Sequence, residues 1–158
     1  MKTATVKEIK IELSDCSHGE LLELCLRLSK FKKENKEILT YLLFESSNEE
    51  KFIRVIKIEV DSLFDNINKD SYYYIRKSVR KILRLIKKYI RYSQNKETEV
   101  ELLIYFCLKL KGFKPSVHQN TTLVNLYLRQ IEFIKKKVAV LHEDLQYDYN
   151  IEIKTLNL

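Results

Sequence analysis

The chain has 158 residues, 45% of them hydrophobic, with 29 Lys and Arg against 22 Asp and Glu. Its length and apolar content suffice for one domain with a sizeable core. With only two glycines and one proline, it lacks the glycine-rich loops of nucleotide-binding enzymes and the turn residues of sheet-rich folds. We therefore expect a single all-α domain over residues 1–158.

The first third of the chain predicts three short helices. Residues 5–13 fit both an alternating strand and a helical turn, and we favour a helix. The next helix should begin near His18, because Ser17 and Glu20 form a capping box ahead of apolar residues at helical spacing. A third should begin near Lys33 and end in the polar residues 45–48.

The middle of the chain predicts two longer helices. Ser47 and Glu50 are expected to cap the first, whose apolar stripe continues from Phe52 to Ile67. The second follows Asp70 or Ser71 and spans about Tyr72 to Tyr92. Its apolar residues recur at steps of three and four, which predicts one buried face, made of Ile75, Val79, Ile82, Ile86 and Tyr89.

The last third predicts two helices separated by a strong stop signal. The first should end at Gly112, which can take the left-handed conformation, and Pro115 prevents it from resuming. Asn120 then caps a helix that we expect to continue unbroken to about Asp148. For residues 149–158, a frayed end, an edge strand and a segment docked on a partner all remain open.

These six or seven helices are joined by short loops, so consecutive helices should be antiparallel. We expect an irregular bundle or a short α-solenoid. Four segments resemble parts of a bacterial all-helical family of unknown function, namely residues 20–24, 36–44, 82–88 and 100–109. The resemblance implies a helical fold, and it supplies no activity or catalytic residue.

Few residues predict chemistry, and we expect no catalytic residue, cofactor or metal. Cys25 and Cys107 lie in apolar helical runs and are expected to be buried, reduced thiols. Asp15, Cys16 and His18 are better explained by helix capping than by a metal. The N-terminus has neither a signal peptide nor a membrane anchor, so we expect a soluble cytoplasmic protein with no membrane contact.

The helix at residues 72–92 is the strongest functional signal. It carries eight Lys and Arg and no acidic residue, and without it 21 basic residues face 22 acidic ones. The helix begins with three tyrosines, Tyr72, Tyr73 and Tyr74, and single-strand-binding proteins use aromatic rings beside cations to stack bases. Lys135 to Lys137, on the last predicted helix, would extend the basic surface if that helix lies beside this one. The candidate nucleic-acid-binding residues are Arg76, Arg80, Arg84, Lys87, Lys88 and Arg91.

Two functions fit these features of the sequence. We expect a non-enzymatic helical interaction module that binds a protein partner, with nucleic-acid backbone binding through residues 72–92 as the alternative. A third explanation of the cations is that they neutralise acidic residues of adjacent helices or keep the domain soluble. The oligomeric state, the partner and the biological process stay open.

Overall fold

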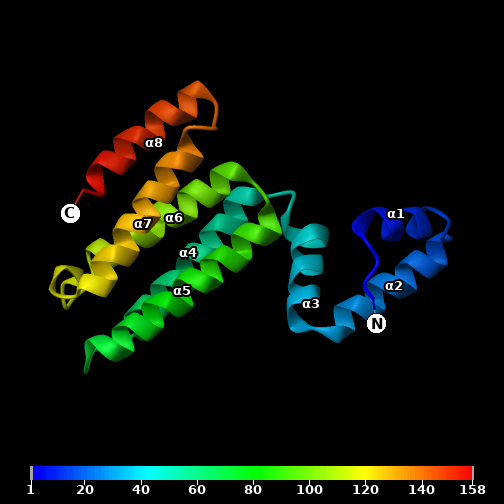
Figure 1. The fold of residues 1–158 in the computed structure, drawn as a ribbon, viewed down its shortest axis with the longest axis horizontal. Helices are drawn as coiled ribbons and strands as arrows, with labels where there is room; N and C mark the ends of the chain where they lie inside the picture. Colours follow the sequence, from blue (N-terminus) through cyan, green and yellow to red (C-terminus); the bar gives the residue numbers. More distant parts are fainter. Residues whose placement is uncertain (1, 158) are drawn as a thin grey trace. The chain divides into compact units, whose positions relative to one another are not determined.

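The computed structural model describes residues 2–157, and these are mostly helical and contain no strand. The predicted all-α fold is confirmed (Figure 1), with eight α-helices in the described residues rather than six or seven. Contacts divide the chain into two compact units, Met1–Phe44 and Glu45–Leu158. The expectation of one domain over the whole chain stays a prediction.

The N-terminal unit contains three helices, and side-chain caps explain where the first two begin. The predicted box of Ser17 and Glu20 is confirmed, and a second box, which was not predicted, joins Thr5 to Glu8. The second box explains why residues 6–14 are helical rather than extended. The helices are α1 (Val6–Ser14), α2 (His18–Phe31) and α3 (Lys33–Thr40), which continues into a π-helical turn at Tyr41–Glu45.

The C-terminal unit is built around one central helix. Half of the 16 residues of α6 are buried, and α6 packs against α4, α5 and α7, while α8 packs against α7. Since α5 and α7 both contact α6, the two helices flank it. The bounds are α4 (Glu49–Asp65), α5 (Tyr72–Ser93), α6 (Lys96–Lys111), α7 (Thr121–Val138) and α8 (Glu143–Thr155).

Several helix ends differ from their predicted form. The cap of α4 is Asn48, whose side chain accepts a hydrogen bond from the Lys51 amide at 3.0 Å, instead of Ser47. Ser71, one of the two predicted caps, is the N-cap residue of α5, but its side chain makes no capping hydrogen bond. Gly112 keeps a right-handed conformation (φ −77°), and among the described residues the left-handed one occurs at Gln94, which ends α5. Asn120 caps α7 as predicted.

The prediction of one helix from Thr121 to Asp148 is wrong, because side chains cap a break at residues 139–142. The side-chain amide of Gln146 donates to the carbonyl oxygens of Leu141 (2.8 Å) and Ala139 (3.4 Å). The Asp144 amide donates to Nδ1 of His142, the N-cap of α8. These bonds satisfy backbone groups at the break that an unbroken helix would pair internally. No glycine or proline marks the break.

The end of the described chain is helical and docked. Ile153 and Leu156 are buried, and the Tyr127 hydroxyl on α7 donates to the Leu156 carbonyl oxygen at 2.6 Å. Residues 149–157 thus form the end of α8 and the two residues after it, and they dock on α7 of the same chain, instead of fraying, forming an edge strand or docking on a partner. Residue 158 lies outside the described residues.

Candidate functional site

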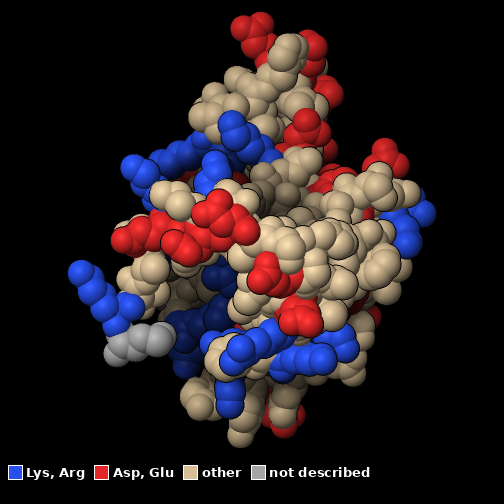
Figure 2. All heavy atoms as spheres, turned by 90° about the vertical axis from the view of Figure 1, so that its right-hand side faces the viewer, with Lys and Arg blue, Asp and Glu red and all other residues tan. Residues whose placement is uncertain are grey.

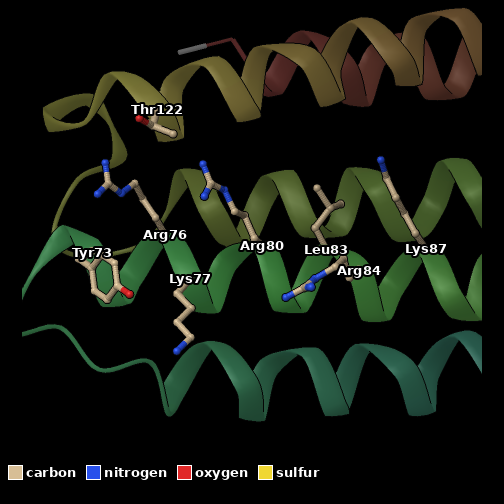
Figure 3. Close-up of a pocket in the computed structure, with 8 residues that line it drawn as sticks. All are labelled: Tyr73, Arg76, Lys77, Arg80, Leu83, Arg84, Lys87 and Thr122. Atoms are coloured by element: carbon tan, nitrogen blue, oxygen red, sulfur yellow. The ribbon is translucent and has the colours of Figure 1, made fainter.

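A groove of about 810 Å³ extends along the exposed face of α5 and reaches the N-terminal turn of α7 (Figure 3). Seven of its lining residues come from α5 and one from α7, and none of them is acidic. We call this hollow, together with its continuation toward the C-terminal end of α5, the basic groove. Its lining residues are Tyr73, Arg76, Lys77, Arg80, Leu83, Arg84, Lys87 and Thr122.

The helical repeat explains why these cations gather on one side. Arg76, Arg80 and Lys87 are separated by four and seven residues, which are close to whole turns of an α-helix. In Figure 3 their side chains extend from α5 toward α7, whereas Lys77 extends the other way, toward α4. On the opposite face of α5 the four predicted aliphatic residues are buried, whereas Tyr89, also predicted there, is half-buried. The cations remain at the surface, and Arg80 and Arg84 are both exposed.

The second hollow of the basic groove lies toward the C-terminal end of α5. It has a volume of about 500 Å³, shares Arg84 and Lys87 with the first, and adds Ile90, Arg91, Glu99, Leu103 and Phe133. Buried Leu83 and Leu103 give the groove an apolar floor. Among the described residues, Glu99 is the one acidic residue that lines either hollow, and it is neutralised by Lys137 at 2.8 Å.

At this end Phe133 connects the two flanking helices. The Nζ atoms of Lys87 and Lys137 lie 5.6 and 5.0 Å from the centre of its ring. Lys137 is therefore part of the cationic surface, as anticipated for residues 135–137. Lys135 instead pairs with Glu132 at 2.9 Å. Phe133 was not predicted as a site residue, although its spacing of four residues from Lys137 was visible in the sequence.

The groove arginines pair with no acidic residue in the part of the chain that the structure describes. Among residues 2–157, none of the ion pairs involves Arg76, Arg80, Arg84 or Arg91. By contrast, on the face drawn in Figure 2, acidic side chains lie among the basic ones. For these four arginines, neutralisation by neighbouring helices is thus not the explanation of their charge.

The remaining predicted site residues divide between the groove and the packing around it. Lys88 lines neither hollow, and its Nζ atom lies 5.0 Å from the centre of the Tyr89 ring. The Tyr72 hydroxyl lies 2.8 Å from the Ser116 carbonyl oxygen and 2.9 Å from Gln119 Oε1 and shares its one hydrogen between these acceptors, so it anchors the start of α5. Tyr73 lines the groove and is exposed. Its ring packs edge-on against Tyr74 with centroids 5.4 Å apart.

Candidate groups for other chemistry are not assembled into a site. Burial raises the pKa of the Cys107 thiol to about 12, which leaves it protonated at neutral pH. Cys25 is exposed, contrary to expectation, because α2 has no buried residue. Residues 2–157 contain no group of three His, Cys, Asp or Glu side chains arranged to hold a metal ion.

Among residues 2–157, no helix is both long enough and apolar enough to cross a membrane. No protein-family model, curated protein or solved structure matches this chain.

Proposed function

We propose that the protein binds nucleic acid, and that the phosphate backbone lies in the basic groove. The observation that supports this most is the set of arginines that line the groove and have no acidic partner among residues 2–157. An unpaired guanidinium retains its full capacity to bind phosphate, since no carboxylate occupies its donors.

The dimensions of the groove suit several phosphates. From Arg76 to Arg91 the helix rises by about 22 Å at 1.5 Å per residue. Nucleotides follow one another at about 3.4 Å along a strand of B-DNA, so several phosphates fit within this length. Each contact releases condensed counterions, which makes binding favourable and dependent on salt.

The N-terminus of α7 adds positive potential at one end. Its first turn contains no acidic residue, and Thr122 in that turn lies on the opposite side of the groove from Arg76 (Figure 3). The first turn of a helix carries partial positive charge from its unpaired amide groups. Because this charge and Arg76 lie at the same end of the groove, they favour the same anion.

Charge reversal in the groove tests this proposal. The groove variant combines Arg80→Glu and Arg84→Glu. The control variant combines Lys81→Glu and Lys136→Glu, which change the net charge by the same amount at exposed positions outside the groove. Fluorescence anisotropy with labelled DNA and RNA at low salt measures the affinity of each variant. The groove variant should bind about 100-fold more weakly than the original chain. The control should remain within about threefold of the original chain.

Two results would overturn the proposal. One is that the original chain binds neither DNA nor RNA at low salt. The other is that the two double variants lose affinity equally, since the loss would then follow from net charge and not from the groove.

A second candidate function is protein binding through the N-terminal unit, and one specific observation favours it. Neither α1 nor α2 has a buried residue, although their apolar side chains are large. Exposed apolar surface of this extent marks a binding surface in a soluble protein. The exposed side chains are Val6, Ile9, Ile11, Leu13, Leu22, Leu24, Leu26, Leu28 and Phe31.

For this surface we propose a second copy of the chain as the partner. Together these side chains expose on the order of 1,000 Å², comparable with the ~800 Å² that each partner contributes to a standard interface. Residues 2–44 carry eight basic and seven acidic side chains, so two copies of this unit do not repel each other. The basic helix, by contrast, would repel its own copy.

Sedimentation analysis tests the second candidate. The original chain should be dimeric, and Leu22→Asp with Leu26→Asp should be monomeric while its helical circular dichroism is retained. Glu23→Lys with Lys30→Glu is a control that exchanges charges and should leave the dimer intact. A monomeric original chain would contradict self-association.

A further inference from the structure

We infer that the basic groove accepts a single strand of nucleic acid and excludes the double helix, with Tyr73 as a stacking platform for a base. The inference rests on the proposed function and narrows its ligand to one class. Three features of the groove support it, namely its width, its apolar floor and its exposed aromatic ring.

The width follows from how the helices pack. Neighbouring packed helices have axes about 8–10 Å apart, so α5 and α7, on either side of α6, have axes at most about 20 Å apart. A helix with its side chains is about 10 Å across, so the space between α5 and α7 over α6 is at most about 10 Å wide. One extended strand fits such a gap. A double helix does not, since its two grooves are about 8.5 and 7.5 Å deep and the duplex is therefore more than about 16 Å across.

The direction of the cations supports the same conclusion. Arg76, Arg80 and Lys87 extend toward α7 and across the groove instead of outward from it (Figure 3). A duplex resting on the rims would reach few of these side chains. A strand within the groove reaches all three, and it does so along one side of its backbone.

The apolar groups of the groove suit unpaired bases. Half-buried Ile90 and buried Leu83 line the groove, and Tyr73 lies at its N-terminal end, on the same side of α5 as Lys77 (Figure 3), with 60% of its surface exposed. Bases of a single strand can stack on aromatic rings, whereas those of a duplex are already stacked on each other. Phe133, at the other end, already has Lys87 and Lys137 over its ring. This leaves Tyr73 as the platform.

Binding of matched single and double strands tests the inference. An oligothymidylate of about 16 nucleotides is compared with the same strand paired to its complement, at one low salt concentration. The single strand should bind at least 10-fold more tightly. Tyr73→Ala should weaken single-strand binding about 10-fold, while Tyr73→Phe, which keeps the ring, should remain within about twofold of the original chain. Tyr147→Ala is the control, because Tyr147 is exposed but lies on α8 outside the groove.

The possible failures are distinguishable. The duplex could bind as tightly as the single strand or more tightly, and the double variant Arg80→Glu with Arg84→Glu could abolish that binding. This result would overturn the single-strand inference and leave the proposed function standing. Equal losses in Tyr73→Ala and Tyr147→Ala would overturn the role of Tyr73. Binding of neither oligonucleotide would overturn the proposed function together with the inference.

Discussion

The ammonium group of Lys87, on α5, lies 5.6 Å from the centre of the Phe133 ring on α7. Lys137 approaches the same ring to 5.0 Å and also pairs with Glu99 on α6. The Phe133 ring thus contacts one cation from each of the helices that flank the groove, Lys87 from α5 and Lys137 from α7. The contact with Lys87 spans from α5 to α7. We expect this arrangement to matter for stability as well as for the position of the charge.

Phe133→Leu should lower the free energy of unfolding by about 1–2 kcal/mol, because two cation–π contacts are lost from a half-buried site. Urea denaturation followed by circular dichroism measures this change. Nucleic-acid binding should weaken only slightly, since no charge is removed. Stability equal to that of the original chain would show that the two contacts contribute nothing.

Leu156→Ala should destabilise the protein by about 2–4 kcal/mol, because Leu156 is a large side chain that is 1% exposed and its removal leaves a cavity. The matched control is Ile151→Ala in α8, where the side chain is 48% exposed and the cost should be well under about 1 kcal/mol. Thermal and urea denaturation compare the two variants. Equal, small effects would contradict the docking of α8 seen in the structure.

The ionisation of Tyr105 should make stability depend on pH in the alkaline range. Its burial, its hydrogen bond to Asp61 at 2.5 Å and the negative charge of Asp61 raise the pKa of Tyr105 to about 12. The unfolded chain releases this proton at its ordinary pKa of 10.0, so the resulting stability is complete below pH 10 and is lost between pH 10 and about 12.

Asp61→Asn removes the charge and weakens the hydrogen bond, so it should lower the pKa of Tyr105 toward its ordinary value. Burial still acts in this variant, so part of the rise should remain. Tyrosine ring carbon shifts in an NMR titration, assigned by Tyr105→Phe, measure the change. An unchanged pKa for Tyr105 would mean that burial alone is responsible.

The outward face of α5 could be predicted from the sequence because it depends on a local repeat. Ile75, Val79, Ile82 and Ile86 recur with the helical period, and burying them turns Arg80 and Arg84 to the surface whatever the rest of the fold. The caps of α2 and α7 were predictable because they too are local. Local patterns therefore specify the helix and half of the groove.

The other half of the groove depends on tertiary structure. Thr122 and Phe133 lie far along the chain from α5, and only the packing of α5 and α7 on α6 brings them to it. The break between α7 and α8 was missed for a related reason. It is stabilised by the side chain of Gln146 reaching back to Leu141, an interaction without the glycine or proline that usually marks a helix end.

The salt dependence of single-strand binding is the most direct test of phosphate binding in the groove. With about four or five phosphates contacted, the logarithm of the association constant should fall against the logarithm of salt concentration with a slope of about −3. Arg80→Ala should reduce the magnitude of this slope by about 0.7, while Lys81→Ala, outside the groove, should leave it unchanged. A slope near zero, or equal slopes for the two variants, would contradict binding of the phosphate backbone by these arginines.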